Sequence, residues 1–385
     1  MDENINKIGI ATVYTGYNYG SALQAFATTR IISSLGMTAA LLKLHGSLIA
    51  GRDIRAKKLF TVVVRSLCHS GGIKSLKNYG KSMSKNLQKE SIRLFDTFTE
   101  QNLRPIEMSY TELKKRAYTD EYAAFLCGSD QVWNSAVFYV DPFYYLQFAP
   151  KDKKIAFAPS FGRDYVPHYN KKKIAKYLSE IPHKSVRETS GAKIVQELTG
   201  DTAEVLPDPT LVLTPAEWKA ELDIKPLSGE KYLLAYFLDT PSELAVQTIE
   251  KISKQYGLRI IGLPYQLDNL PWSIVSAGPK EFVQYISGAS FVCTDSFHGT
   301  AFSLNFNVPF YTFERNYGDA GKQSTRVLSL LDSVDMLSRL DPSVTDDCME
   351  LPFNQINEKL SQMRDTSYAY LRKSITNLTA DIGGR

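Results

Sequence analysis

The chain has 385 residues, of which 43% are hydrophobic and 22% are charged, and its formal net charge is +4. A chain of this length and composition buries a sizeable core in two or three domains, which excludes a disulfide scaffold, a collagen-like chain and wholesale disorder. The four cysteines lack the spacing of a zinc site or a redox pair, so we expect a reducing compartment and no metal. A polar, acidic start and the absence of any long apolar run predict a cytoplasmic protein.

Apolar runs alternate with helical patterns along the first 213 residues. The patterns predict strands at 7–13, 37–44, 123–127, 155–159, 185–187 and 203–206. They predict helices at 21–35, 53–68, 73–98 and 189–199. Ser21 can cap the first of these helices and Gly36 can end it. Residues 1–213 are therefore expected to form an N-terminal α/β domain.

A second series follows residues 214–230, which mix proline, glycine and charge and are typical of a connection. Strands are predicted at 231–237, 258–263, 291–294 and 309–313, and helices at 241–256, 279–288 and from His298 onward. We expect residues 231–350 to form a C-terminal α/β domain, and a long helix within 351–385 could pack back on the first. This double alternation predicts two Rossmann-like, doubly wound domains facing a cleft, with sites at the carboxyl ends of their strands.

Positive charge is concentrated in residues 52–93, which hold eleven basic and two acidic residues. Six apolar residues follow helical spacing there: Ala56, Leu59, Phe60, Val63, Val64 and Leu67. A basic amphipathic helix can lie on an anionic membrane, and it can equally cover the protein's own core. The charge can also mark a solvated surface, and no motif favours nucleic acid.

A loop of Gly, Asn and Tyr separates the first strand from its helix. Asn18, Gly20 and Ser21 lie at the expected start of that helix, where backbone N–H groups attract carboxylate or phosphate. Glycine there would let a ligand approach closely, although a loop can also need glycine for its own turn. The loop is neither a dinucleotide fingerprint nor a phosphate-binding P-loop.

A polar cluster follows the apolar strand at 123–127. Asp130 is a candidate general base, because such a base needs only reach to a hydroxyl and a suitable pKa. Trp133 could stack on a sugar ring, with Asn134 beside it as a further acceptor contact. Alternatively, Asp130 caps a helix and Trp133 belongs to the core.

Arg187 follows one predicted strand and precedes a helix. A planar guanidinium at this place can hold a carboxylate or a phosphate through two hydrogen bonds. The alternative is a structural ion pair with Glu188 or Glu204.

His298 lies at a probable helix start, among Asp295, Ser296 and Gly299. The helix dipole disfavours an imidazolium there unless an anion is bound, which suits a proton donor used beside a phosphate. A lone histidine is more often structural, but this polar setting favours catalysis.

Residues 318–326 combine two glycines with Lys322, Ser324 and Arg326 before a predicted helix. Such a segment can be an anion-binding loop or an ordinary solvated loop. We expect it to contribute to a donor site.

Six segments in order resemble the polysaccharide pyruvyl transferase family: 18–24 (NYGSALQ), 128–134 (GSDQVWN), 158–162 (APSFG), 185–188 (SVRE), 206–209 (LPDP) and 295–299 (DSFHG). The resemblance implies a fold like that of two-domain GT-B glycosyltransferases. It implies transfer of pyruvate from phosphoenolpyruvate to two hydroxyls of one sugar, as a cyclic ketal. It also implies that the acceptor is a cell-surface glycan or its lipid-linked precursor.

The resemblance also implies roles for individual residues. Arg187 would hold the donor, His298 would donate a proton, and Asp130 is a weaker assignment as the base. Phosphoenolpyruvate is the donor substrate, and neither a cofactor nor a metal is expected. Donor contacts are expected from Ser296, Gly299, Lys322, Ser324 and Arg326, and acceptor contacts from Asn18, Gly20, Ser21, Trp133 and Asn134.

One position departs from the family pattern. Many members carry arginine two residues before the catalytic histidine, whereas this chain has Ser296. We hypothesise that Arg326 or Lys322 supplies the missing charge. The basic segment 52–93 could dock the enzyme on the inner membrane leaflet, beside a lipid-linked acceptor. The rival readings are a nucleotide-sugar glycosyltransferase and a non-catalytic glycan-binding relative.

Overall fold

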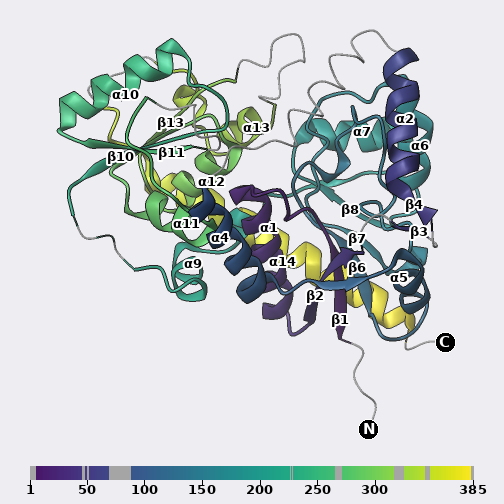
Figure 1. Ribbon diagram of the computed structural model, residues 1–385. Coiled ribbons are helices and arrows are strands. Elements are labelled where there is room, and N and C mark those ends of the chain that lie inside the picture. Colours follow the sequence, from purple (N-terminus) through teal and green to yellow (C-terminus); the bar gives the residue numbers. More distant parts are fainter. Residues whose placement is uncertain are drawn as a thin grey trace.

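The computed structural model describes residues 6–45, 48–49, 52–68, 88–225, 227, 229–264, 271–315, 325–342 and 347–382 (Figure 1). Most of the helix predicted at 73–98 lies outside the described residues, as do Lys322 and Ser324. No helix in the described part of the chain is long and apolar enough to cross a membrane.

The first half is built on a seven-stranded sheet in the order β5-β2-β1-β6-β7-β8-β9, and its neighbouring strands pair in parallel. The strands are β1 (Lys7–Ala11), β2 (Thr38–Leu44), β5 (Ile106–Met108), β6 (Ala124–Cys127), β7 (Lys154–Ala156), β8 (His183–Val186) and β9 (Glu204–Val205). The helices are α1 (Tyr19–Ser34), α2 (Ile54–Cys68), α4 (Lys89–Phe98), α5 (Tyr110–Ala117), α6 (His168–Leu178) and α7 (Thr189–Thr199). Shorter elements are the hairpin of β3 (Leu48–Ile49) and β4 (Arg52–Asp53), a π-helix at Thr99–Leu103, and 3-10 turns at Gln131–Trp133 and Lys151–Lys153.

The second half is built on a four-stranded parallel sheet in the order β11-β10-β12-β13. Its strands are β10 (Tyr232–Phe237), β11 (Arg259–Pro264), β12 (Phe291–Thr294) and β13 (Phe310–Thr312). Its helices are α10 (Glu243–Tyr256), α11 (Pro279–Gly288), α12 (Phe297–Asn305) and α13 (Thr325–Ser333), with a 3-10 turn at Leu337–Arg339. Two parallel sheets, each with its own helices, confirm the predicted α/β class with two Rossmann-like halves.

The segment between the halves is helical in part. It contains α9 (Pro215–Glu221), which starts with a capping box between Thr214 and Glu217, and it follows the short helix α8 (Pro209–Val212). Trp218 of α9 is fully buried, packing at 5.7 Å between ring centroids on Phe26 of α1 and at 5.1 Å on Phe302 of α12. The predicted connection therefore contributes to the core instead of spanning the surface.

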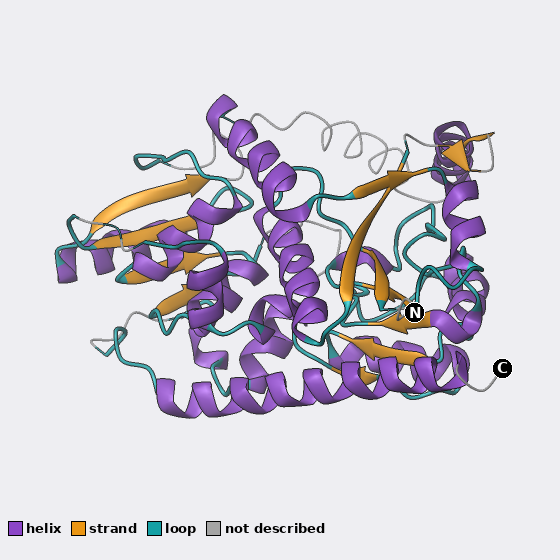
Figure 2. Ribbon diagram, turned by 90° about the horizontal axis from the view of Figure 1, so that it is seen from below, coloured by secondary structure: helices purple, strands orange, loops and turns teal. Residues whose placement is uncertain are grey.

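The long helix α14 (Phe353–Ile382) runs beneath both sheets (Figure 2). The Tyr370 hydroxyl donates to the Ala156 carbonyl of β7 at 2.8 Å. Arg364 donates to the Leu211 carbonyl at 3.0 Å and to the Asn305 side chain of α12 at 2.8 Å. This helix therefore contacts elements from both halves.

A direct contact also joins the halves at α1. The Tyr19 ring stacks on Phe282 of α11, with centroids 4.8 Å apart, and its hydroxyl donates to the Ala277 carbonyl at 3.1 Å. One apolar cluster includes buried residues from both sheets, such as Ile8 and Leu234. The two sheets therefore share part of one close-packed core.

Helix α1 begins earlier than predicted. Asn18 is its N-cap, and the Asn18 side chain accepts a hydrogen bond from the Ser21 backbone N–H at 3.1 Å. The prediction that Ser21 caps this helix was wrong, because Ser21 lies in the first turn with its hydroxyl directed elsewhere. Asparagine is as good an N-cap as serine, and the sequence offered both.

Candidate active site

The ends of several parallel strands surround a cavity of about 420 Å³ between the two halves. Its wall includes residues from the loops after β1, β6, β10, β12 and β13 and from the starts of α12 and α13. Eight of the polar side chains that line it are those of Asn18, Ser21, Asp130, Asn134, Ser296, His298, Arg315 and Arg326.

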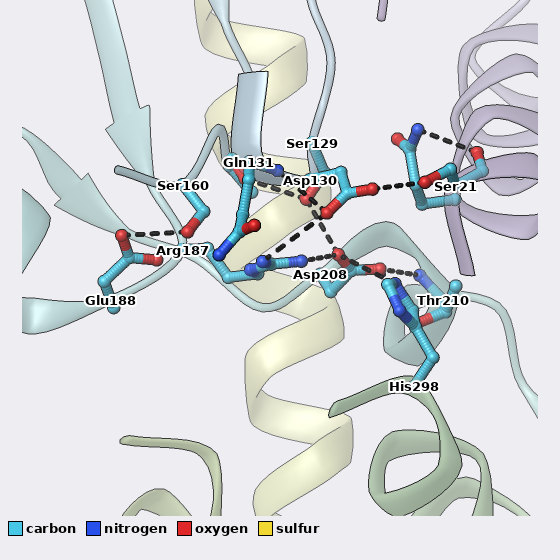
Figure 3. A network of polar contacts seen from close by, with 12 residues as sticks. Ser21, Ser129, Asp130, Gln131, Ser160, Arg187, Glu188, Asp208, Thr210 and His298 are labelled. Carbon is cyan, nitrogen blue, oxygen red and sulfur yellow. Dashed lines mark hydrogen bonds and ion pairs between the residues drawn. The ribbon is translucent and has the colours of Figure 1, made fainter. Parts of the chain in front are cut away.

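The centre of the polar network is an ion pair between Arg187 and Asp208 (Figure 3). Arg187 follows β8 and donates from Nη1 to Asp208 Oδ2 at 2.6 Å. The same oxygen accepts from the Ser129 hydroxyl at 2.8 Å, and Asp208 Oδ1 caps α8 by accepting from the Thr210 N–H at 3.0 Å. Burial raises the pKa of Asp208, but His298, Arg187 and the Thr210 N–H outweigh it and hold that pKa far below its usual range.

The other two nitrogens of Arg187 differ from Nη1 in their contacts. Its Nε and Nη2 are buried and make no hydrogen bond to any described residue, and Nη2 lies 4.0 Å from Asp130 Oδ1. The guanidinium also packs over the Phe297 ring, 4.3 Å from its centroid. A smaller cavity of about 140 Å³ lies against Arg187, Asp208, Phe297 and Arg326. Since buried N–H groups are almost always paired, these two donors can accept an anionic ligand as a hydrogen-bond partner.

His298 lies in the first turn of α12 and is only 6% exposed. Its Nε2 is 3.8 Å from Asp208 Oδ2 and makes no hydrogen bond within the described residues. The ring is placed by Gly20, since a Cβ at that position would lie 1.9 Å from His298 Nδ1. The expectation that Gly20 gives room to a ligand is therefore corrected, because it gives room to the catalytic candidate instead.

Asp130 occupies a strained backbone position after β6, with φ 69° and ψ −174°. This region normally suits only glycine, and such residues cluster at functional sites. Asp130 Oδ2 accepts from the Ser21 hydroxyl at 2.5 Å, and Oδ1 accepts from the Gln131 N–H at 2.8 Å. Burial opposes ionisation, but His298, Arg187 and Ser21 together lower the pKa of Asp130. It is therefore an anion at neutral pH, able to accept a proton or a hydrogen bond.

Trp133 does not face the cavity. It is fully buried, stacks on Tyr145 with centroids 5.3 Å apart, and donates from Nε1 to the Tyr144 carbonyl at 3.1 Å. The predicted sugar-stacking role is therefore wrong, and the alternative reading of a core residue is correct. Asn134 lines the cavity, although its Oδ1 accepts from the Ala136 N–H at 3.0 Å.

On the side of the second half, Ser296 is the N-cap of α12, and its hydroxyl accepts from the Gly299 N–H at 3.4 Å. A Cβ at Gly299 would lie 2.4 Å from Thr294 Oγ1, so glycine is needed there for packing against Thr294 and not to make room for a ligand. Arg326 lines both cavities. With its amide oriented so that the oxygen faces Arg326, Gln131 accepts from Nη2 at 3.0 Å and from Nε at 3.2 Å.

Three residues at the site were not predicted from the sequence as site residues: Asp208, Arg315 and Gln131. Asp208 stands before a proline at a helix start, a capping signal that indicated structure only. Arg315 follows β13 and shows no motif of its own. No group of three metal-binding side chains occurs among the residues that the structure describes.

Comparison with known proteins decides the family. The model of the family "polysaccharide pyruvyl transferase" matches residues 18–317. The chain belongs to this family. The resemblance inferred from the six motifs is thereby confirmed, and the protein is a transferase. The search of curated proteins gives no significant match.

Solved structures with a similar architecture include UDP-GlcNAc 2-epimerase from Neisseria meningitidis, which is 10% identical, with 98% of each chain covered and a TM-score of 0.45. A UDP-glucosyltransferase from Polygonum tinctorium is 12% identical, with 97% of this chain and 98% of that chain covered and a TM-score of 0.44. At these values the likenesses do not bear on the chemistry of the pyruvyl transferase site.

Proposed function

We propose that this polysaccharide pyruvyl transferase takes pyruvate from phosphoenolpyruvate and attaches it to two hydroxyls of one sugar. The acceptor would be a sugar in a cell-surface polysaccharide or in its lipid-linked precursor. The observation that carries the proposal is that three buried nitrogen atoms in one network, Arg187 Nε and Nη2 and His298 Nε2, have no hydrogen-bond partner among the described residues. A donor with both a carboxylate and a phosphate suits a site with several guanidinium groups.

The reaction balances without an oxidant or a reductant. Two acceptor O–H bonds, the C2–O bond to phosphate and the π component of the C2=C3 double bond break, while two C2–O bonds to the sugar, one C3–H bond and one phosphate O–H bond form. One of the two hydroxyl protons ends on C3, giving the methyl group of the ketal, and the other leaves with the phosphate. In this scheme His298 delivers a proton to C3 and is restored by a hydroxyl proton.

We assign Asp130 to the acceptor side. It lies beside Ser21 in the cavity wall, whereas Asp208 is occupied by its hydrogen bonds to Arg187, Ser129 and Thr210. Its lowered pKa makes it a weak base toward a free hydroxyl. A sugar hydroxyl becomes much more acidic as it bonds to C2, so Asp130 can accept its proton late in the attack.

Calorimetric titration of phosphoenolpyruvate tests the proposal, with the wild type and the Arg187→Ala, His298→Ala and Arg259→Ala variants. Arg259 is an exposed arginine on β11 and serves as the matched control. We expect binding to the wild type and to Arg259→Ala, loss in Arg187→Ala, and near-normal binding in His298→Ala. Phosphate release with a glycan panel should then require His298.

Two results would replace the proposal. Binding of nucleotide sugars with release of a nucleoside diphosphate would indicate glycosyl transfer. Glycan binding without any donor binding, in the presence or absence of the glycan, would indicate a non-catalytic relative.

We also propose that α2 docks the enzyme on anionic lipid near a lipid-linked acceptor. One face of α2 is fixed to the protein, with Val62 and Ser66 buried and Arg65 donating to the Phe138 carbonyl at 2.6 Å. Phe60 and Leu67 are exposed, at 70% and 73%. The surrounding segment 52–93 carries eleven basic and two acidic residues, a surplus of nine positive charges. An apolar stripe within a basic segment matches an anionic membrane surface.

Vesicle co-sedimentation tests the docking, with phosphatidylglycerol-containing and pure phosphatidylcholine vesicles at low and high salt. We expect salt-sensitive binding to the anionic vesicles alone. Phe60→Ser combined with Leu67→Ser should weaken it roughly tenfold or more, since each exposed side chain would lose its burial in lipid. Leu244→Ser, an exposed leucine on α10, is the control. Equal binding by the double variant would refute the role of α2.

A further inference from the structure

A second arginine–aspartate pair brings its arginine into the wall of the main cavity, whereas Arg187 and Asp208 lie against the smaller one. Arg315, just after β13, lines the main cavity together with Ser296 and His298. Its Nε donates to the Asp295 carbonyl oxygen at 3.0 Å and lies 3.3 Å from Asp295 Oδ2. Asp295 directly precedes Ser296, so these contacts place Arg315 beside the position where the family pattern predicts an arginine.

Asp295 joins the ends of three neighbouring strands. It follows β12, its Oδ1 accepts from the Leu238 N–H at 2.7 Å, and its Oδ2 accepts from the Asp239 N–H at 3.1 Å. Leu238 and Asp239 follow β10, and Arg315 follows β13. A carboxylate bonded to two backbone N–H groups is fixed in orientation, so it can orient the guanidinium bound to it.

The surroundings of Arg315 suit a dianion. Ser296 and His298 line the cavity from the N-terminal end of α12, a helix of nine residues, where the helix dipole favours negative charge. His298 belongs to the same wall and is only 6% exposed. Its Nε2 makes no hydrogen bond in the described part of the chain. Arg326 lines the cavity as well. Arg187 lies instead against the smaller cavity, where it donates to Asp208, so it is assigned to the carboxylate end of the donor.

On the basis of the proposed function, we propose that Arg315 binds the phosphate group of phosphoenolpyruvate at the start of α12, and that Asp295 is the positioning residue that holds Arg315 there. The donor would then lie with its carboxylate toward Arg187 and its phosphate toward Arg315. This arrangement places the phosphate beside His298. Arg315 is thus the residue that compensates for Ser296, a role that the sequence assigned to Arg326 or Lys322.

Calorimetric titrations with phosphoenolpyruvate, inorganic phosphate and pyruvate separate the two ends of the donor. We expect Arg315→Ala to weaken phosphoenolpyruvate and phosphate binding by roughly tenfold to a hundredfold, the usual effect of losing hydrogen bonds to a charged group. Pyruvate binding should be unchanged, as should all three in the control Arg259→Ala. Arg315→Lys should recover part of the affinity, because it restores the charge without the planar fork.

The same titrations separate this inference from the proposed function. Unchanged phosphoenolpyruvate affinity in Arg315→Ala overturns the inference while the pyruvyl transfer proposal stands. An equal loss of pyruvate binding also overturns it, because Arg315 would then hold the carboxylate. If the wild type binds phosphate but not phosphoenolpyruvate, the proposed function fails, and loss of phosphate binding in Arg315→Ala still supports the anion site.

A double-mutant cycle tests the part played by Asp295. If Asp295 acts only through Arg315, Asp295→Asn should weaken phosphoenolpyruvate binding in the wild type and have no further effect in Arg315→Ala. Once a glycan acceptor is found, Asp295→Asn should raise the KM for the donor more than it lowers kcat. Additive losses of affinity would show that Asp295 acts independently of Arg315, and would refute its positioning role.

Discussion

The site contains two arginine–aspartate pairs, and the net pKa shifts of their carboxyl groups are opposite, although burial raises the pKa of both. Asp208, paired with Arg187 at 2.6 Å, has a pKa held far below its usual range. Asp295, beside Arg315 at 3.3 Å, has a pKa raised to about 6, chiefly by burial and in spite of Arg315. Both carboxyl groups are almost wholly buried, at 0% and 6% exposure, so burial alone does not separate them.

The difference lies in the charge and the contacts around each carboxyl. Asp208 has Arg187 and His298 on one side and accepts hydrogen bonds from Ser129 and Thr210. Asp295 has one arginine, and the nearby Asp239 opposes its ionisation. Since a buried charge is stable only when its partners repay the lost hydration, Asp208 is permanently ionised while Asp295 titrates near neutrality. The first pair is thus a fixed anchor, and the second can respond to ligand and pH.

Breaking the Arg187–Asp208 pair should have the largest effect. Asp208→Asn keeps a cap for α8 but leaves the Arg187 charge buried without its partner, so we expect a loss of about 3 kcal/mol in the free energy of unfolding. Urea denaturation measures it. Glu90→Gln, which breaks the exposed pair with Arg93, is the control and should leave stability unchanged. A similarly small loss in Asp208→Asn would show that the pair is not an anchor.

Gly20→Ala should separate catalysis from stability. A Cβ at this position would lie 1.9 Å from His298 Nδ1, so the imidazole must leave its place beside Asp208. Because alanine favours a helix over glycine by about 1 kcal/mol, thermal unfolding should report little net loss, whereas phosphate release falls as far as in His298→Ala. In a His298→Ala background, Gly20→Ala should have no further effect on turnover. Normal turnover in the single variant would show that His298 does not need this position.

The opposite pKa shifts predict opposite effects of acid on stability. In the folded state Asp295 takes up a proton near pH 6, and in the unfolded state it does so near the ordinary pKa of an aspartate. Acidification from pH 7 to 4 therefore stabilises the folded state, because the buried carboxyl becomes neutral there first. Relative to Asp295→Asn, the wild type should gain on the order of 2–3 kcal/mol over that window. Asp208 behaves in the reverse sense, since its contribution persists through that window and is lost only in stronger acid. Urea denaturation of the wild type and Asp295→Asn over that pH range measures the difference. An equal pH dependence in the two proteins would show that the pKa of Asp295 is not raised.

The sequence predicted that several residues of this site follow strands. Asp130, Arg187 and His298 each follow a predicted strand, and sites in doubly wound α/β halves lie at the carboxyl ends of their strands. Their convergence was therefore predictable without a structure. Strand β5 and helices α5 and α6 were not predicted, and β5 has only three residues.

What the sequence could not predict depends on packing between distant segments. Trp133 sits in a polar motif, yet its ring stacks on Tyr145, twelve positions along the chain, and never reaches the cavity. Asp208 shows a capping signal within the segment 206–209, and its ion pair with Arg187 forms between residues that follow the neighbouring strands β8 and β9. Arg315 is recognised as a site residue through its contacts with Asp295, which lies twenty residues earlier in the chain. Such contacts are made by the tertiary fold, and local patterns do not encode them.

The smallest expected effect concerns Asp130, which lies between the two pairs. Its hydrogen bond from Ser21 at 2.5 Å is one of the contributions that lower its pKa, after those of His298 and Arg187. Ser21→Ala removes that contribution alone, so the acid limb of the pH–rate profile should move upward by less than about one pH unit. Donor affinity should be unchanged, because the Ser21 hydroxyl donates to Asp130 and not to either arginine assigned to the donor. A shift in donor affinity without a change in the acid limb would place Ser21 on the donor side, and Asp130 would then belong with the anion-binding groups instead of the acceptor.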